Sequence, residues 1–489
     1  MILDPDQCYR ALRTHDARFD GRFFVGVGTT GIYCRPVCTA KTPLERNCRF
    51  FPSAAAAEGA GFRPCLRCRP ELAPGYATVD ANRRLAQSAA GLIEDGRLEE
   101  ASLADLAATL GVTDRHLRRV FQQEFGVSPV DYAQTQRLLL AKRLLTDTAL
   151  PVLDVAMASG FASLRRFNDL FRTRYRMTPG ALRKAAPARA GADRLVFDLA
   201  YRPPYDWLAM LAFLERRRIT GVEAVDGRRY RRTIRLERGG KAHAGWIEVT
   251  PSPRKSALRV TASASLAGAV PALLARVKPL LDLASRPDEI AAALGPLAEA
   301  HPGLRLPGAV DGFEVAVRAI LGQQVTVAAA TTIAGRFAGA FGDRVDTSHA
   351  GLDHLFPTPA RIAATAPSEI AALGIIASRA RAIAALAREV DRGSLRLEPS
   401  APVDETLAAL ERIPGVGPWT AQYIAMRALA WPDAFPHPDV AVLKAMGETN
   451  GRRALERAEA WRPWRSYAVL HLWKSLERPA GATPSRRKP

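Results

Sequence analysis

Residues 409–444, ALERIPGVGPWTAQYIAMRALAWPDAFPHPDVAVLK, decide the fold expected for the second half of this 489-residue chain. Within them, residues 413–417 form a tight glycine turn between two apolar helical patterns. Glycine has no Cβ and tolerates positive φ, so the backbone of this turn can approach a ligand closely. Its free N–H groups, followed by the N-terminus of a helix, predict a phosphate site at Gly415, Val416 and Gly417.

An acid, Asp439, follows the turn and opens another helical pattern. The loop before it contains Pro432, Pro436 and Pro438, which restrict the backbone. This arrangement could fix one carboxylate beside the glycine turn. Alternatively, the turn is an ordinary helix connection and Asp439 only caps a helix, although an acid can cap a helix and still act in catalysis.

This stretch resembles the helix-hairpin-helix glycosylases of DNA base repair, and within them the bacterial 3-methyladenine DNA glycosylase II of the AlkA type. The resemblance extends over roughly Leu195 to Leu476 and rests on several family motifs that occur in family order. These motifs are Pro203-Pro204-Tyr205-Asp206-Trp207, Pro302-Gly303-Leu304-Arg305-Leu306-Pro307-Gly308, Ala319-Ile320-Leu321-Gly322-Gln323-Gln324 and Trp461-Arg462-Pro463-Trp464-Arg465-Ser466-Tyr467-Ala468.

The resemblance implies roles for particular residues. Asp439 matches the catalytic acid, and Gln324 matches the side chain that fills the gap left by an extruded nucleotide. A polar side chain at the Gln324 position departs from many relatives. The family's aromatic base pocket falls on Phe213, Trp419, Tyr423 and Trp473, which could otherwise be simple core residues.

The same resemblance indicates the type of reaction. A base alkylated on a ring nitrogen is cationic, so it stacks well on aromatic faces and leaves readily. A desolvated carboxylate then stabilises the positive charge that develops on the sugar. Glycosylases that also nick the strand use a lysine where this chain has Trp419, so we expect base release without strand cleavage. The family hairpin also binds a monovalent cation through backbone carbonyls.

Composition narrows the class of protein. The net charge is +20, and basic residues outnumber acidic ones in residues 1–80, 81–185 and 186–489 alike. Every segment could therefore contact a polyanion, although solvated basic surfaces would give the same excess. No secretory signal and no apolar run of about 18 residues is present. We expect a cytoplasmic protein, on the bacterial nucleoid, with no membrane partner and no organic cofactor.

All six cysteines lie within the first 68 residues. Cys34 and Cys38 form one short pair, and Cys65 and Cys68 form a second. Two such pairs can bind Zn²⁺ through four thiolates, which leaves Cys8 and Cys48 outside. Spacing alone favours a structural zinc site, with a redox pair as the alternative.

The residues around these cysteines resemble the N-terminal domain of the Ada methylation-response protein. They are Thr29-Thr30-Gly31-Ile32-Tyr33-Cys34-Arg35-Pro36-Val37-Cys38 and Gly61-Phe62-Arg63-Pro64-Cys65-Leu66-Arg67-Cys68-Arg69-Pro70. The resemblance implies that the cysteine matching Cys34 takes a methyl group from a methylated DNA phosphate. Methylation would lower the negative charge of the zinc–thiolate centre from −2 to −1 and strengthen DNA binding, which would act as a switch.

Residues 81–185 contain an internal repeat with a spacing of about 50 residues. Each half predicts a helix, a glycine turn at Gly111 or Gly160, and a second helix, as in a helix-turn-helix. The pair resembles the AraC-type DNA-binding domain. Individually, its candidate readers are more often backbone contacts or solvated side chains than base contacts. They are Arg115, His116, Arg118 and Arg119 in the first unit and Ser163, Arg165, Arg166 and Asn168 in the second.

The expected fold is multidomain and mainly α. It comprises a small zinc α+β domain (1–80), a tandem helix-turn-helix all-α domain (81–185), an α+β subdomain (193–300), an all-α helix-hairpin-helix glycosylase domain (301–478) and a disordered tail (479–489). A short linker of small residues is expected at 185–192. No cysteine follows Cys68, so the guanine-methyl transferase carried by many Ada proteins should be absent.

We interpret the chain as a bifunctional alkylation repair protein and transcriptional activator. It would bind double-stranded DNA at alkylated and promoter sites, accept methyl groups on Cys34 once only, excise bases of the 3-methyladenine type and contact RNA polymerase. The alternative is a damage-responsive regulator whose C-terminal half is a non-catalytic DNA-binding module.

Overall fold

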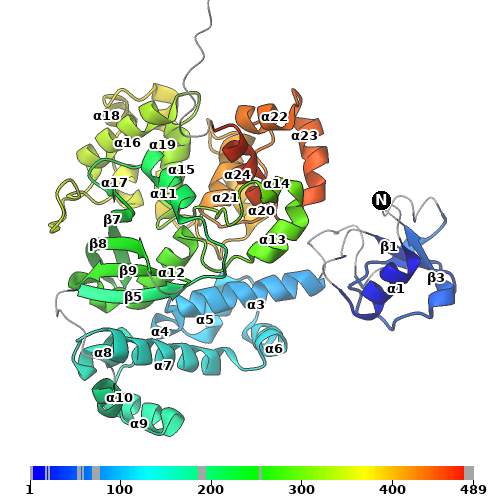
Figure 1. The fold of residues 1–489 in the computed structure, drawn as a ribbon, viewed down its shortest axis with the longest axis horizontal. Coiled ribbons are helices and arrows are strands. Elements are labelled where there is room, and N and C mark those ends of the chain that lie inside the picture. Colours follow the sequence, from blue (N-terminus) through cyan, green and yellow to red (C-terminus); the bar gives the residue numbers. More distant parts are fainter. Residues whose placement is uncertain are drawn as a thin grey trace, which may run out of the picture. The chain divides into compact units, whose positions relative to one another are not determined.

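The computed structural model describes residues 4–16, 19, 23–51, 57, 60–65, 67–68, 78–185, 194–252 and 256–477 (Figure 1). The chain divides into two compact units, residues 1–93 with 101–133 and residues 94–100 with 134–489. The expected linker after residue 185 and the expected tail lie outside the described residues. Across the described ranges, no helix is long and apolar enough to cross a bilayer.

The described residues of the N-terminal part form a four-stranded sheet and the helix α1. Its strand order is β3-β1-β2-β4, with β1 antiparallel to β2 and β3 and with β2 parallel to β4. Phe23 and Val25 are fully buried in its small core. The elements are α1 (Pro5–Arg13), β1 (Phe24–Val27), β2 (Ile32–Cys34), the 3₁₀ turn η2 (Glu45–Asn47), β3 (Cys48–Phe51) and β4 (Arg63–Pro64).

Residues 78–185 are helical, as expected from the internal repeat. Gly111 and Gly160 adopt φ of 70° and 82° in the two turns, a conformation that glycine takes without a Cβ clash. Thr113 and Ser163 cap the second helix of each unit through their hydroxyl groups. The helices are α3 (Thr78–Glu94), α4 (Arg97–Glu100), α5 (Leu103–Thr109), α6 (Asp114–Phe125), α7 (Pro129–Asp147), α8 (Val152–Ala158), α9 (Leu164–Tyr175) and α10 (Pro179–Ala185).

A five-stranded antiparallel sheet follows, with strand order β5-β9-β8-β7-β6. The sequence predicts β-rich runs at 195–197, 230–236, 246–249 and 258–261 and one helix at 207–217, and the four longer strands and α11 lie there. The short strand β6 was not expected, because four residues carry too little alternation to predict a strand. The elements are β5 (Arg194–Ala200), α11 (Trp207–Arg216), β6 (Glu223–Asp226), β7 (Arg229–Arg238), β8 (Lys241–Pro251), β9 (Ala257–Ser263), η4 (Ala264–Ala269) and α12 (Val270–Leu280).

One hydrophobic core joins this sheet to helices on both sides of it in the sequence. Side chains of α7, α8 and α9 belong to the same cluster as those of β5, β7, β9 and α12. Leu144, Phe167, Phe197 and Leu273 are each fully buried in it. The second helix-turn-helix and the α+β subdomain therefore share a core.

The C-terminal part is a second helical core. Its central helix α15 is buried on nearly every side, and the buried charge of Glu314 is paired with Arg232 and Arg318. The elements are α13 (Pro287–Leu294), α14 (Pro296–Glu299), α15 (Gly312–Leu321), α16 (Val327–Phe341), α17 (Pro359–Ala363), α18 (Pro367–Ala371), α19 (Ala377–Asp391), α20 (Val403–Glu411), α21 (Pro418–Arg427), α22 (Val440–Met446), α23 (Gly451–Ala458), η5 (Glu459–Trp461) and α24 (Arg465–Ser475).

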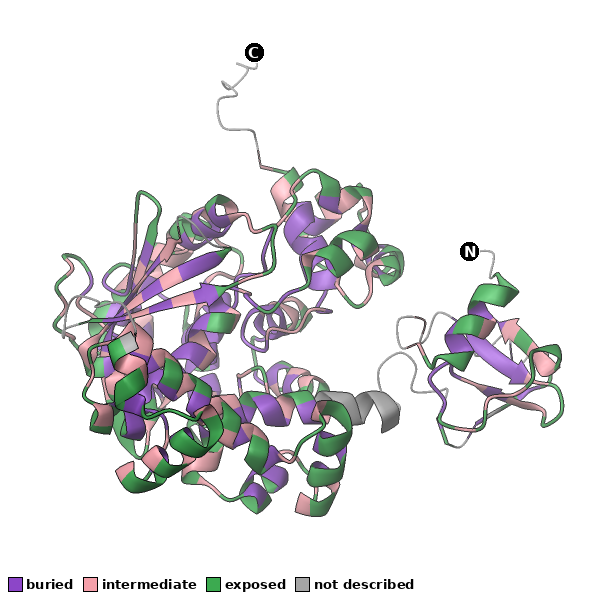
Figure 2. Cartoon of the chain, turned by 60° about the horizontal axis from the view of Figure 1, so that its bottom comes forward, coloured by how far each residue is buried: buried purple, intermediate pink, exposed green. Residues whose placement is uncertain are grey.

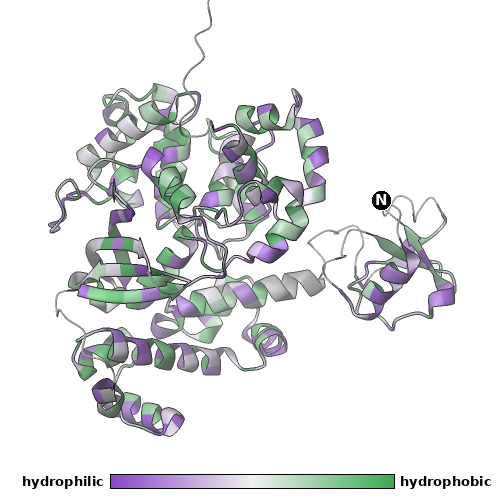
Figure 3. Cartoon of the chain, viewed as in Figure 1, coloured by the Kyte–Doolittle hydropathy of each residue, from purple (hydrophilic) through white to green (hydrophobic). Residues whose placement is uncertain are grey.

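The helices around α15 are amphipathic. Buried and exposed residues alternate around them (Figure 2), and hydrophobic and hydrophilic residues alternate in the same way (Figure 3). The glycine turn lies between α20 and α21, where Gly415 has φ of 94°. A Cβ at Gly415 would lie 3.4 Å from the Cβ of Ala382, so both the backbone conformation and the close approach to α19 favour glycine there.

Candidate active sites

Asp439 is the N-cap of α22, and its half-buried carboxylate accepts three hydrogen bonds. Oδ1 accepts from the backbone N–H of Val442 at 2.8 Å and from Nε1 of Trp473 at 3.1 Å, and Oδ2 accepts from Nε1 of Trp419 at 2.8 Å. Capping therefore coexists with contacts to two of the expected pocket residues. A carboxylate oxygen can accept about two hydrogen bonds, so Oδ2 keeps a lone pair that could face a ligand.

Three of the four expected pocket aromatics lie together. Trp419 stacks on Tyr423 with 5.3 Å between ring centroids and 8° between planes. Tyr423 and Trp473 are tilted by 44° at 6.3 Å. Trp419 and Tyr423 come from α21, and Trp473 comes from α24. Their faces form a wall next to the carboxylate of Asp439.

The fourth expected pocket aromatic, Phe213, lies on α11 and packs in one cluster with Trp473. It is 8% exposed and packs with Leu304, Leu470 and Trp473. The guanidinium carbon of Arg217 lies 3.8 Å from its ring centroid, and that of Arg427 lies 4.9 Å away. Two cations thus contact this ring.

Neither of these arginines was among the residues expected from the sequence. The signal was available, because Arg217 follows Phe213 by four residues and Arg427 follows Tyr423 by four, which places each pair on one helix face. Arg427 donates to the hydroxyl of Tyr423 at 2.7 Å. Although burial raises the pKa of Tyr423, the positive charges of Arg427, Arg217 and Arg318 outweigh it and lower the pKa to about 8.

Gln323, the residue before the one expected to fill the gap in the DNA, is hydrogen-bonded to the glycine turn. Nε2 of Gln323 donates to the carbonyl of Gly415 at 2.8 Å and to Oγ1 of Thr420 at 3.0 Å. Gln324, the next residue, is exposed and has φ of 53°. This left-handed conformation is uncommon for a residue with a side chain, and it turns Gln324 away from the path of a regular helix.

The four expected cysteine ligands come together. The sulfurs of Cys34, Cys38, Cys65 and Cys68 all lie within 4.8 Å of one another. Four sulfurs around a tetrahedral zinc at about 2.3 Å would be roughly 3.8 Å apart, so the cluster fits this ion. Cys8 and Cys48 do not belong to the cluster.

The directions in which the pKa values of these cysteines are shifted also fit binding of a divalent cation. Hydrogen bonds from Cys34 and Cys68 lower the pKa of Cys38, whereas the hydrogen bonds to Cys38 and Cys68 raise the pKa of Cys34. Four thiols at this distance therefore cannot all ionise unless a positive charge joins them. The donor chemistry and the geometry agree on zinc.

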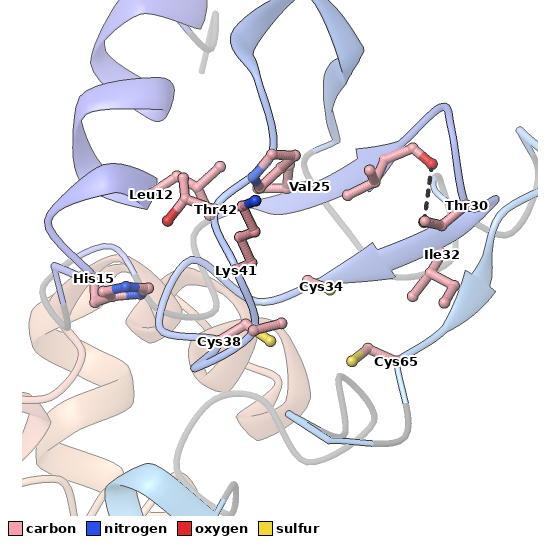
Figure 4. A pocket seen from close by; sticks show the side chains of 13 residues that line it. Leu12, His15, Val25, Thr30, Ile32, Cys34, Cys38, Lys41, Thr42 and Cys65 are labelled. Carbon is pink, nitrogen blue, oxygen red and sulfur yellow. Dashed lines mark hydrogen bonds between the residues drawn. The ribbon is translucent and has the colours of Figure 1, made fainter.

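Cys34 differs from the other three ligands in its access. It is half-buried at the end of β2, whereas Cys38, Cys65 and Cys68 are buried. A cavity of about 170 Å³ is lined by Cys34, Cys38 and Cys65 together, and its lining also includes His15, Lys41 and Thr42. Figure 4 shows Lys41 and Thr42 beside the cysteines.

The expected readers of the helix-turn-helix repeat lie on α6 and α9, apart from Ser163, which caps α9. Arg115, Arg119, Arg165 and Arg166 are exposed. Arg118 forms an exposed ion pair with Asp114 at 2.7 Å, a weak interaction in water that a DNA phosphate could replace. The structure therefore leaves these side chains accessible on the second helix of each unit.

The carboxylate with its aromatic wall, the four-cysteine cluster and the helix-turn-helix repeat define a base-repair enzyme joined to a DNA-binding regulator. Family models agree over most of the chain. They are the metal binding domain of Ada (residues 7–71), a helix-turn-helix domain (106–185), the AlkA N-terminal domain (196–311) and the HhH-GPD superfamily base excision DNA repair protein (317–466).

Curated relatives are similar over the whole chain and over its second half. A Mycobacterium tuberculosis protein named probable bifunctional transcriptional activator/DNA repair enzyme AlkA is 41% identical over 502 residues, which cover 99% of each chain. This chain belongs to the same family of bifunctional transcriptional activator/DNA repair enzymes. DNA-3-methyladenine glycosylase 2 of Escherichia coli is 37% identical over 57% of this chain and 96% of its own. A solved structure of the methylated N-ADA/DNA complex is 33% identical, covers 28% of this chain and 98% of its own, and has a TM-score of 0.21.

Proposed function

We propose that this protein repairs alkylated DNA in two ways and activates transcription in response. It hydrolyses the N-glycosidic bond of alkylated bases of the 3-methyladenine type, and it accepts methyl groups from DNA methylphosphotriesters on Cys34. The observation that carries the first activity is the carboxylate of Asp439, which two indole N–H groups orient beside stacked aromatic rings. Both the relatives and the family models support the combination.

The excision mechanism follows from the aromatic wall of Trp419, Tyr423 and Trp473 and from the carboxylate of Asp439. The target nucleotide leaves the stack, and Gln324 is positioned to occupy the space that it vacates. The base stacks against the aromatic wall, and the free lone pair of Asp439 Oδ2 faces the sugar. As the C–N bond breaks, the carboxylate stabilises the positive charge on the sugar and orients the attacking water.

No amine is available in the turn to attack the sugar. Trp419 occupies the position at which nicking glycosylases place a lysine, so the product is an abasic site in an intact strand. The hairpin N–H groups of Gly415 and Gly417 bind the DNA backbone, whereas the N–H of Val416, also expected to do so, already donates to the carbonyl of Ile413. A monovalent cation at the hairpin stays a prediction, since the carbonyls of Ile413 and Gly415 already accept hydrogen bonds from Val416 and Gln323.

Methyl transfer is assigned to Cys34, the least buried residue of the cluster, because the residues around it match the Ada domain. The thiolate of Cys34 attacks the methyl carbon of the phosphotriester, the C–O bond breaks, and the phosphodiester leaves as an anion. Zinc, when bound by the four sulfurs, keeps them deprotonated. Because no step restores the thiolate from the thioether, each molecule reacts once. The charge lost at the contact surface strengthens DNA binding, which supports a switch to activation through RNA polymerase.

We also propose the domain limits 1–80, 81–185, 193–300 and 301–478. The four family models match residues 7–71, 106–185, 196–311 and 317–466, and the third of them extends 11 residues past the proposed limit at 300.

The test of the excision activity is abasic-site formation on methylated duplex DNA. With enzyme in excess, the wild-type protein should release 3-methyladenine without nicking the strand. Asp439→Asn keeps a helix-capping side chain but loses the charge, so the rate should fall on the order of 10² to 10³ with little change in DNA affinity. An Asn variant with the wild-type rate would remove the role assigned to Asp439. Binding without any base release by the wild type would instead favour the non-catalytic regulator.

A further inference from the structure

Asp282, just after α12, joins three of the sequence motifs that carry the resemblance to the glycosylases. The hydroxyl of Tyr467 donates to its carboxylate, 3.1 Å from Oδ1 and 3.0 Å from Oδ2, and the N–H of Leu306 donates to Oδ2 at 3.0 Å. The main-chain carbonyl of Asp282 accepts from Arg305, which also donates to the carbonyl of Pro204. Tyr467, Leu306 and Arg305 are buried, so the carboxylate faces the interior.

Arg305 is a buried cation whose hydrogen bonds go to neutral groups. Its guanidinium donates to the hydroxyl of Ser285 and to main-chain carbonyls, and its carbon lies 4.8 Å from the ring centroid of Tyr205. Burial lowers the pKa of Arg305, and the charge of Asp282 opposes that shift. The ionised carboxylate therefore compensates the charge of this guanidinium.

The first element that Asp282 holds, α24, reaches the proposed catalytic acid. Tyr467 and Trp473 both lie on this helix, and Nε1 of Trp473 donates to Asp439 at 3.1 Å. A helix of this length moves as one body, because its main-chain hydrogen bonds fix each turn on the one before it. The position of Tyr467 therefore sets the position of Trp473.

The second element, the loop of residues 302–308, lies behind the aromatic wall. Its residue Leu304 packs in one cluster with Phe213 and with α24. Two main-chain carbonyls of the same loop accept from Arg427, which donates to the hydroxyl of Tyr423 at 2.7 Å. A shift of this loop would therefore be passed to the wall.

Asp282 is the member of this cluster that changes charge near neutral pH. Burial raises the pKa of its carboxyl group to about 7, against the opposing effects of the N–H of Leu306, the charge of Arg305 and the hydroxyl of Tyr467. The other groups that face it keep their charge, because burial raises the pKa of both Tyr205 and Tyr467 well above 10 and a guanidinium stays protonated. Protonation of Asp282 therefore replaces charge-assisted hydrogen bonds by weaker neutral ones.

We propose that Asp282 is a positioning residue for base excision, whose ionised carboxylate holds α24 and the loop 302–308 where they place Trp473 against Asp439. This inference rests on the proposed glycosylase function and adds a control by pH to it. Asp282 acts through other residues, so it should affect the rate of excision and not the affinity for DNA.

The test follows single-turnover release of 3-methyladenine by the full-length chain from about pH 6 to about pH 8. The wild-type rate should fall about tenfold as the pH is lowered through about 7. Asp282→Asn keeps the shape of the side chain but cannot ionise, so its rate at about pH 8 should be about tenfold below that of the wild type and should show no such step. The two proteins should bind an abasic-site duplex equally well.

The comparison of the two proteins isolates Asp282. Other groups titrate in the same range, among them Tyr423, but both proteins contain them. Asp198→Asn is the matched control, because it removes an acid that pairs with Arg259 at 2.8 Å in the five-stranded sheet, and it should keep the wild-type profile.

A step of unchanged size in Asp282→Asn would overturn the proposal, and so would an equal slowing at every pH, since Asp282 would then have only a packing role. If Asp282→Asn does not fold, Tyr467→Phe takes its place. It removes a hydroxyl group that lowers the pKa of Asp282, so the midpoint of the step should move to higher pH, and an unchanged midpoint would overturn the proposal. Failure of the wild type to release 3-methyladenine at any pH would count against the glycosylase function itself.

Discussion

Nε1 of Trp419 donates a hydrogen bond to Oδ2 of Asp439 at 2.8 Å, although the two residues are twenty positions apart. The same indole stacks on Tyr423. One side chain thus orients the acid and forms part of the wall against which a base would stack. A lysine at this position would disrupt both interactions.

Trp419→Phe should slow base excision by about tenfold while DNA affinity stays the same. Phenylalanine keeps a ring against Tyr423 but cannot donate to Asp439, so the carboxylate loses one of its orienting hydrogen bonds. Single-turnover rates and binding to an abasic-site duplex, measured separately, distinguish this from a loss of affinity. Trp464→Phe is the matched control, since Trp464 packs against Tyr467 instead. A wild-type rate in Trp419→Phe would contradict the orienting role.

Cys65→Ser should reduce bound zinc from one ion per chain to well below one. Serine lacks a thiolate, and three remaining sulfurs bind the ion more weakly. Metal analysis of the purified protein is the measurement. Cys48→Ser is the control and should keep its zinc, because Cys48 is outside the four-sulfur cluster. Full occupancy in Cys65→Ser would exclude the four-cysteine site.

Incubation with methylphosphotriester DNA should add one methyl group, on Cys34 alone. Cys34 is the one half-buried residue of the cluster, and it is the cysteine that the Ada-like residues around it match to the methyl acceptor. Peptide mass spectrometry locates the modification, and Cys34→Ser should remain unmodified. A methyl group found on Cys38, Cys65 or Cys68 would show that the wrong sulfur has been assigned.

Tyr423 should titrate near pH 8. Its pKa in the folded protein is about 8, below the ordinary value of 10, so the unfolded chain binds more protons between these values. The contribution of this residue to stability therefore rises with pH, is complete above about pH 10, and is lost as the pH falls through about 8. Ultraviolet difference spectra of the wild type and Tyr423→Phe would isolate the titration.

Arg427→Met provides the control for that titration. Removal of the guanidinium that donates to the Tyr423 hydroxyl should move the pKa upward, towards the ordinary value. An unchanged midpoint in Arg427→Met would mean that another charge sets the pKa of Tyr423.

The sequence alone determined the features that depend on neighbouring residues. The glycine turn at Gly415, the cap at Asp439, the helix-turn-helix repeats and the paired cysteines could all be predicted, because each requires only particular residue types at short spacing. The four family models match these same regions. The pairing of Phe213 with Arg217 was also within reach of the sequence, through its four-residue spacing.

Only the tertiary structure decided which distant side chains meet. Trp473, on α24, donates to Asp439 although it lies 34 residues further along the chain. Arg427, on α21, contacts the ring of Phe213, on α11. The second helix-turn-helix and the five-stranded sheet share a core that no local pattern indicates. An amphipathic helix shows in its sequence which face is buried but not which partner buries it, because apolar burial is non-directional and shape complementarity among distant elements makes the choice.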